Sequence, residues 1–326
     1  VNHLRGKILK PIVHIPHHGK KCIKILMYRQ IDQSMSDDAS TNEVLSVLVA
    51  TTKNIIYKYE ISPDTYQLVQ KYKFEYPLND MFMQNDTSHI VYVGTDDNFV
   101  TEINLTTNTL KHIYKGQSPI TAIRGHEEVS DQLLFGEAKG QLVLFDLSKE
   151  APLTIVHAEL NHDGPLRSLD WHPRNKDLVV AVSGRYFWVW DLEKRTLIGE
   201  KSCHFDFARD VRFLPHKELA LVTASASQIQ TWHFVDQYTE EEKMFANEPN
   251  PMVMGKDGKL HSFINQRRTK NSPICGFVKS EEYSQAGQIG GIFVETQRDW
   301  ADYNHEHAVV VVGGDRTINM YAIDDS

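Results

Sequence analysis

The sequence has few cysteines, no long apolar run and no sign of a targeting segment. Its three cysteines, Cys22, Cys203 and Cys275, are far apart and lack CxxC spacing, which argues against a disulfide framework and a structural zinc site. No apolar run approaches the roughly 18 residues that a membrane helix needs, and residues 1–10 hold no apolar core of a secretory signal. We therefore expect an intracellular protein without membrane contact, nuclear or cytoplasmic, with the nucleus favoured.

The motifs of common active sites are also missing. The sequence contains no GxSxG, HExxH or P-loop. Its acidic pairs are chain neighbours that alternate faces in a strand, so they do not build a two-carboxylate site: Asp37-Asp38, Asp96-Asp97 and Glu281-Glu282. Zinc-finger spacing is absent from the cluster of His14, His17, His18 and Cys22, which we interpret as a polar loop. We expect no catalysis, no cofactor, no metal and no small-molecule substrate.

A basic surplus is lacking as well. With 35 Lys and Arg against 43 Asp and Glu, the formal net charge is -8, which disfavours broad attachment to phosphate backbones. The one basic run, residues 265–270, carries three positive charges, fewer than a typical nucleic-acid or targeting cluster. Direct binding of nucleic acid is therefore not expected.

What the sequence does contain is a repeat. Six β-rich hexamers recur with 42 to 45 residues between their last positions, except for a final gap of 89: IYKYEI (56–61), VTEINL (100–105), LVLFDL (142–147), FWVWDL (187–192), IQTWHF (229–234) and INMYAI (318–323). A period near 40 residues is typical of stacked β units. The wide gap can hold one more unit, because residues 252–264 can be laid on residues 133–145 with the turn glycines Gly258 and Gly140 matched, which offsets the two ranges by one residue.

Each unit predicts four antiparallel strands. An apolar strand and a short polar turn precede each hexamer, which is a hairpin signature. Before most hairpins, a proline marks the start of a further strand, where it breaks no ladder bond: TyrProLeu at 76, SerProIle at 118, GlyProLeu at 164 and SerProIle at 272. After the hexamers come candidate outer strands, YQLVQKYKF, TLKHIYKG, PLTIVHAEL and RTLIGEK.

These observations predict an all-β fold, a single seven-bladed β-propeller of four-stranded antiparallel blades that occupies residues 1–326 as one domain. Because residue 326 follows directly on a third strand, we expect the N-terminal strand Lys7–Ile15 to close the ring as the missing outer strand. We interpret residues 30–42 as a mobile polar loop and residues 279–307 as an insertion in the last blade.

The stretch from Gly164 to Glu200 resembles a WD repeat, with Trp190-Asp191 closing its third strand. The other units have FD, YE, IN, WH and YA in place of WD, and His162 is the nearest equivalent of the usual GlyHis pair. The second and fourth units are similar to spindle-checkpoint and messenger-RNA-export propellers that bind short helical peptides; nuclear-pore propellers remain equally open. The resemblance implies a protein-binding platform, and the regular repeat predicts that Trp190 is buried.

We therefore expect a non-catalytic scaffold or adaptor subunit of a multiprotein complex that binds a peptide or a neighbouring subunit on its top face. Exposed Tyr, Trp and Arg favour interfaces, and the candidate residues come from turns, strand starts and the predicted insertion: Asp97, Lys139, Arg167, Arg185, Tyr186, Arg209, Arg316 and Trp300. Alternatively, Tyr186 could pack on the turn of the adjacent blade, and Trp300 could fix the insertion onto its blade. A nucleic-acid-binding propeller would need Arg124, Arg167, Arg209 and Arg316 to converge, and a propeller hydrolase would need clustered carboxylates or histidines in the channel.

Overall fold

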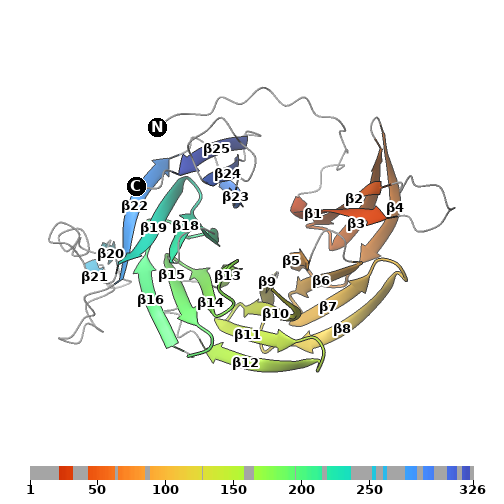
Figure 1. Ribbon diagram of the computed structural model, residues 1–326, viewed down its shortest axis with the longest axis horizontal. Helices are drawn as coiled ribbons and strands as arrows, with labels where there is room; N and C mark the ends of the chain where they lie inside the picture. Colours follow the sequence, from red (N-terminus) through yellow and green to blue (C-terminus); the bar gives the residue numbers. More distant parts are fainter. Residues whose placement is uncertain are drawn as a thin grey trace. The chain divides into compact units, whose positions relative to one another are not determined.

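The computed structural model describes most of the chain up to residue 235 and separate segments beyond it (Figure 1). The described residues are 22–31, 43–62, 65–84, 89–126, 128–157, 165–194, 196–214, 219–235, 252–254, 260–262, 276–284, 289–296, 307–313 and 318–323. All regular structure in these ranges is β-strand, and none of it is a helix that could cross a membrane. The chain forms two compact units, Arg5–Leu160 and Asn161–Ser326, the second of which also includes Val1–Leu4.

The first unit contains three antiparallel sheets of four strands each, and in each sheet the strands follow in chain order. The first sheet is β1 (Cys22–Ile31), β2 (Glu43–Thr51), β3 (Ile55–Ser62) and β4 (Thr65–Lys73). The second is β5 (Leu78–Met83), β6 (Ile90–Thr95), β7 (Phe99–Asn104) and β8 (Thr109–Lys115). The third is β9 (Ile120–His126), β10 (Val129–Glu137), β11 (Gln141–Asp146) and β12 (Ala151–His157).

The second unit begins with a sheet of the same kind, but its later sheets differ in strand order or strand number. Its first sheet is β13 (Leu166–Trp171), β14 (Leu178–Ser183), β15 (Tyr186–Asp191) and β16 (Thr196–Ser202). The next joins β17 (Asp210–Phe213), β18 (Ala220–Ala224) and β19 (Gln228–Val235) to the much later β22 (Gly276–Ser284). The remaining strands are the pair β20 (Met252–Met254) and β21 (Leu260–Ser262), and the three-stranded sheet of β23 (Ile289–Thr296), β24 (His307–Gly313) and β25 (Ile318–Ile323).

Consecutive sheets within a unit share apolar cores. In the first unit, Leu48 and Ile56 of the first sheet join Met81 and Val93 of the second in one buried cluster. The opposite face of the second sheet buries Tyr92 and Val100 with Phe135 and Phe145 of the third sheet. Because both faces of an inner sheet are covered, its strands lose the apolar–polar alternation of a half-exposed sheet, and β6 is buried at five of its six positions. The second unit repeats this scheme through Val180 and Phe187, which pack with Val211 and Leu221.

The turns between second and third strands have one repeated chemistry. A residue in the left-handed region occupies this turn in the first four sheets: Asn54 (φ 58°), Asn98 (φ 72°), Gly140 (φ 90°) and Gly184 (φ 55°). Glycine and asparagine adopt positive φ most readily, which explains why these two residue types recur at this place. The predicted hairpins are confirmed at these four positions.

The turns between third and fourth strands depend on the last residue of the third strand. Asp146 accepts hydrogen bonds from the backbone N–H groups of Ser148 (2.9 Å) and Lys149 (3.0 Å). Asp191, the acidic residue of the Trp-Asp pair, accepts the N–H of Lys194 at 2.8 Å, and Asn104 accepts the N–H groups of Thr106 and Thr107 at 3.0 Å. A short side chain that accepts these bonds stabilises a tight turn.

The prolines mark strand starts as predicted. Pro77, Pro119 and Pro165 immediately precede β5, β9 and β13, the first strands of their sheets. The four predicted outer strands are confirmed as β4, β8, β12 and β16, each at the edge of its sheet.

The arrangement after β19 differs from the prediction. Residues 252–264 do not form a blade: their strands β20 and β21 make a separate two-stranded sheet. The chain then returns to the sheet it left, where Val235 of β19 pairs with Gly276 of β22. The wide gap between hexamers therefore arises from a long excursion between the third and fourth strands of one sheet. The SerProIle at 272 precedes this fourth strand and not a first strand.

Two predicted loops are also corrected. Residues 279–307 are not an insertion, because β22 and β23 occupy much of this segment and belong to two different sheets. The loop predicted at residues 30–42 starts later, since β1 extends to Ile31, which pairs with Glu43. The closing strand predicted at residues 7–15 lies outside the described residues.

Candidate protein-interaction surface

The predicted residues of the first unit lie in turns. Asp97 is half-buried in the turn after β6, where its carboxylate accepts a hydrogen bond from the hydroxyl of Thr95. Lys139 is exposed in the turn after β10, and its backbone N–H donates to the Ser118 hydroxyl at 3.1 Å. The Asp97 carboxylate therefore stabilises its own turn, whereas Lys139 takes part in its turn through its backbone and exposes its side chain.

The described residues predicted in the second unit belong to its first two sheets. Arg167 is exposed on β13, Arg185 is half-buried in the two-residue turn between β14 and β15, and Arg209 directly precedes β17. Arg316 and Trp300 lie outside the described residues.

Tyr186 is not an exposed anchor. Its side chain is only 8% exposed, and its ring lies 6.0 Å from that of Trp188 on the same strand. The expectation of a solvent-facing aromatic at this turn is therefore wrong, because Tyr186 is already the first residue of β15. Trp190, two positions further, is buried at 5% exposure as predicted, and its ring stacks on Trp188 at 6.4 Å.

Sequence reasoning missed two exposed aromatics in the connection between β16 and β17. We call residues 203–208 the aromatic loop. Within it, Phe205 is 74% exposed and Phe207 is 47% exposed, whereas the flanking Cys203, His204 and Ala208 are buried. Among the described residues, no large apolar side chain is more exposed than Phe205.

The aromatic loop is fixed at both ends by backbone hydrogen bonds to the turn after β14. The N–H of Cys203 donates to the carbonyl of Arg185 at 2.8 Å, and the N–H of Ala208 donates to the carbonyl of Gly184 at 2.7 Å. In its middle, Asp206 accepts the N–H of Ala226 at 3.2 Å. These bonds place Arg185 next to the base of the loop.

Buried side-chain contacts also fix the aromatic loop to strand β18. The Nε2 atom of His204 lies 3.0 Å from the Thr223 hydroxyl on β18, which also accepts a hydrogen bond from the Trp232 indole at 3.0 Å. His204 and Thr223 are both buried. Burial raises the pKa of the neighbouring Cys203 thiol well above its usual range, so this cysteine stays protonated at neutral pH.

Positive charge borders the exposed rings. The guanidinium of Arg167 lies over the ring of Phe207, 5.8 Å from its centre, which is cation–π geometry. Arg209 donates to the carbonyl of Ile289 at 3.3 Å. Within the described part of the chain, Arg167, Arg185 and Arg209 form no ion pair with an acidic side chain.

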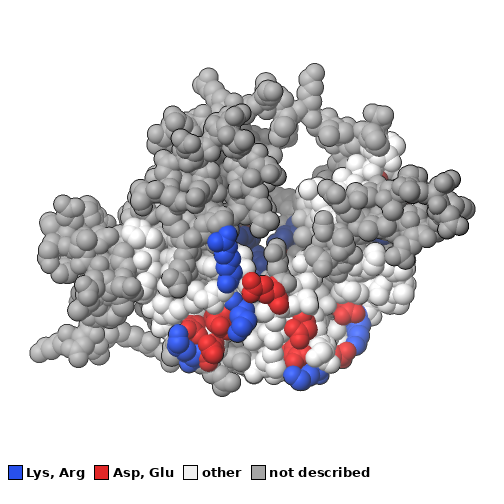
Figure 2. Space-filling model, in the orientation of Figure 1, with Lys and Arg blue, Asp and Glu red and all other residues white. Residues whose placement is uncertain are grey.

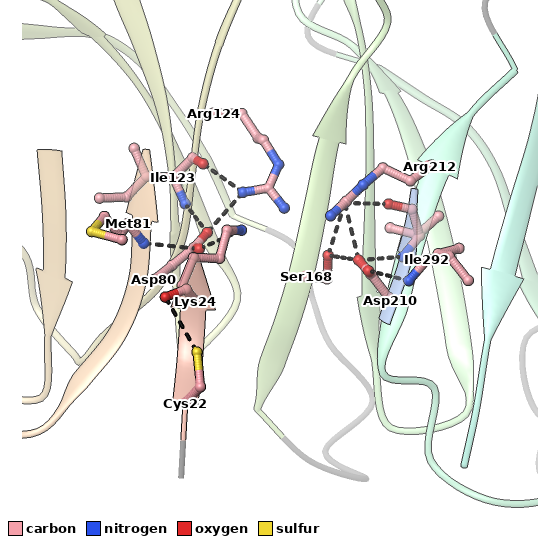
Figure 3. Close-up of polar contacts among 11 residues, drawn as sticks. Cys22, Lys24, Asp80, Met81, Ile123, Arg124, Ser168, Asp210, Arg212 and Ile292 are labelled. Carbon is pink, nitrogen blue, oxygen red and sulfur yellow. Dashed lines mark hydrogen bonds and ion pairs between the residues drawn. The ribbon is translucent and has the colours of Figure 1, made fainter. Parts of the chain in front are cut away.

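The carboxylates of the first strands, buried in Asp80 and half-buried in Asp170 and Asp210, link neighbouring sheets, as Figure 3 shows for Asp80 and Asp210. Asp80 on β5 lies between two cations, with Lys24 Nζ of β1 at 2.8 Å and the Arg124 guanidinium of β9 at 2.7 Å. It also accepts the N–H of Ile123 on β9 at 3.1 Å. Asp80 therefore connects the first strands of three consecutive sheets.

The second unit has an equivalent connection. Asp210 on β17 accepts the Ser168 hydroxyl of β13 at 2.6 Å and the N–H of Ile292 on β23 at 3.2 Å (Figure 3). Its partner Arg212 lies 3.0 Å away. Asp170 on β13 accepts the N–H of Phe213 on β17 at 2.8 Å. A carboxylate that accepts a backbone N–H of the next sheet's first strand is thus a repeated structural device.

These carboxylates are engaged in structure and are not arranged as an acid–base pair. Burial by itself would raise the pKa of Asp80, but the charges of Lys24 and Arg124, with the hydrogen bonds it accepts, hold that pKa well below its usual range. Among the described residues there is no group of three His, Cys, Asp or Glu side chains that could hold a metal ion.

Successive four-stranded antiparallel sheets joined in chain order are the blades of a β-propeller. A chain in a solved structure titled "Crystal Structure of Mitotic Checkpoint Complex" has the same fold, with a TM-score of 0.59 over 98% of this chain and 100% of that chain, at 10% sequence identity. The fold is of the propeller type.

Sequence comparison adds one relative. The chain is 28% identical to Nucleoporin Nup37 of Drosophila melanogaster over 95 residues, and this match spans 29% of each of the two chains. No protein-family model matches the sequence.

The sequence pattern of the aromatic loop explains why sequence analysis did not identify it. The HisPheAspPheAla segment at 204–208 alternates apolar and polar residues as a short strand does, so its phenylalanines resemble core positions. The signal that could have revealed them is their place between an outer strand and the next first strand, where a propeller has a connecting loop.

Proposed function

We propose that this protein is a non-catalytic scaffold subunit of a multiprotein complex, and that it binds a protein partner through the aromatic loop and the neighbouring arginines. The observation that carries the proposal is the pair of exposed phenylalanines on a loop whose backbone is fixed at both ends. Phenylalanine and arginine are enriched at the cores of protein interfaces. A rigid loop loses little conformational entropy when a partner binds, so more of the contact energy appears as affinity.

The comparisons with known proteins support the proposal of a subunit in a nuclear complex. The relative is by its name a nucleoporin, and the solved structure with the same fold is by its title part of a multiprotein complex. We propose on this basis that the protein acts in the nucleus, as a subunit at or near the nuclear pore. We also propose that the blades form a closed ring and that residues 7–15 supply the strand that closes it.

The two alternative functions have less support. The nucleic-acid alternative needs Arg124, but Arg124 is held by Asp80 and donates to the carbonyl of Ile123. On the face drawn in Figure 2, Lys and Arg side chains of the described parts lie among Asp and Glu side chains and form no continuous basic field. The hydrolase alternative needs free carboxylates, whereas Asp80 and Asp210 each accept backbone N–H groups with both oxygens.

The test is purification of the tagged full-length chain from cells at native expression level, followed by size-exclusion chromatography and mass spectrometry. We expect a complex with partners in fixed stoichiometry, and a fluorescent fusion concentrated at the nuclear envelope. Recovery of the chain as a monomer without stoichiometric partners would contradict the scaffold proposal. A diffuse cytoplasmic signal would contradict the nuclear-pore setting alone.

A further inference from the structure

The surroundings of the aromatic loop carry information about what it binds, and this inference rests on the proposed function. Two observations combine here. The loop exposes apolar rings, and among the described residues the charged side chains beside it are Arg167, Arg185 and Arg209 against Asp206.

In the part of the chain that the structure describes, Asp206 forms no ion pair with these arginines. Its carboxylate accepts the backbone N–H of Ala226, on the turn after β18. The next acidic residue in the chain, Asp210, already pairs with Arg212 and accepts the hydroxyl of Ser168. Within the described residues, no carboxylate pairs with the arginines beside the loop, and we infer that they can bind carboxylates of a partner.

Arginine is suited to this task, because its planar guanidinium donates two parallel hydrogen bonds to a carboxylate. The protein as a whole is acidic, with a net charge of -8, which does not favour nonspecific attraction of acidic partners to its surface. A small cationic and aromatic site on an acidic protein therefore favours acidic partners and also determines where on the surface they bind.

We propose that the aromatic loop is the docking site for an extended acidic segment of a partner protein. The segment places an apolar side chain against Phe205 and Phe207 and carboxylates on Arg167 and Arg185. A protein segment fits better than single-stranded nucleic acid, whose affinity depends on many phosphate contacts along a basic groove. Three arginines at one loop provide too few such contacts.

The experiment uses the full chain and defined probes in fluorescence anisotropy. The first probe is a labelled peptide of Asp and Glu residues around a central Leu-Phe pair. Its controls are the same peptide with Lys in place of every acid, the same peptide with Ser in place of Leu and Phe, and a labelled oligodeoxythymidine. Binding is measured at about 0.05 M and about 0.3 M salt, which changes the screening length about 2.5-fold.

Two double variants test the site. Phe205→Ser with Phe207→Ser removes the rings, and Arg167→Glu with Arg185→Glu reverses the charges. The matched controls lie in the other unit: Leu110→Ser removes an exposed apolar side chain of β8, and Lys53→Glu with Lys73→Glu reverses two exposed charges. Circular dichroism and melting curves establish that each variant is folded.

We expect saturable binding of the acidic Leu-Phe peptide to the unmodified chain, a loss of about tenfold or more in each site variant, as interface anchors show, and less than about twofold change in the controls. Higher salt weakens binding to the unmodified chain and to the ring variant. Three results overturn the inference: no saturable binding by the folded unmodified chain, equal binding by the ring variant, or tighter binding of oligodeoxythymidine that the same variants abolish. If stoichiometric complexes persist in cells while the peptide result is negative, the scaffold proposal stands and only the docking site is wrong.

Discussion

At the residue scale, buried side chains with several partners decide how the sheets of each unit are held together. Asp80 is the clearest case, since one carboxylate has two cations and a backbone N–H of the next sheet as partners. The ion pair alone is a weak argument for stability, because removing charges from water is costly. Removal of the Asp80 charge alone is a different matter, since the cations Lys24 and Arg124 then lose the negative charge between them.

Asp80→Asn should therefore lower the free energy of unfolding by about 3 kcal/mol at neutral pH, near the lower end for a broken buried pair because Lys24 is partly exposed. The pKa of Asp80 is lowered by folding, so its contribution is fully present above the unfolded-state pKa of about 3.9 and is lost as pH falls below it. Urea titrations between about pH 6 and pH 2.5 measure this. The gap between the two proteins should narrow on acidification; a gap that stays constant would assign the cost to geometry instead of charge.

The Thr223 hydroxyl is a second buried group with several partners, because it lies within hydrogen-bond distance of both the His204 ring and the Trp232 indole. Thr223→Val keeps the shape and removes the hydroxyl, so two buried polar groups lose a partner. We expect a loss of about 1 to 3 kcal/mol in the free energy of unfolding. Thr107→Val, at an exposed turn, is the control and should change stability by less than about 0.5 kcal/mol.

At the element scale, local chemistry predicted hairpins well and failed where the chain leaves a sheet. Asparagine and glycine in the turns and proline before first strands have local causes, so sequence alone located β5, β9 and β13 correctly. The local sequence does not show whether residues 252–264 form a new blade or an excursion from an existing sheet. The sheet of β19 is completed by β22, which follows some 40 residues later in the chain. The arginines of the site were found by residue type, whereas the exposure of Phe205 depends on backbone bonds to a distant turn.

The excursion offers a test at the same scale. Since Val235 pairs with Gly276, replacement of residues 237–274 by a four-residue turn of about the usual hairpin length should leave the sheet of β17, β18, β19 and β22 intact. We expect a melting temperature within about 4 °C of the original, which corresponds to less than about 1 kcal/mol. Failure of the shortened protein to fold would restore the interpretation of residues 252–264 as a blade.

At the scale of the whole molecule, the sheets differ in how many strands the described residues give them. The sheet of β23, β24 and β25 has three strands, whereas the regular sheets have four. A fourth strand would cover the backbone N–H and C=O groups on the outer side of β25, which would otherwise be open to pairing with another chain. The apolar segment KILKPIVHI at residues 7–15 is our candidate for this strand.

Deletion of residues 1–15 should therefore lower the melting temperature by several degrees and promote aggregation, because it removes a row of backbone hydrogen bonds and exposes a strand edge. Shortening the chain elsewhere provides the control. Ile31 pairs with Glu43, so replacing residues 32–42 by a short turn removes a similar length without taking away a strand, and it should leave the melting curve nearly unchanged. Differential scanning fluorimetry with light scattering compares the two. If both deletions behave alike, residues 7–15 do not close the propeller.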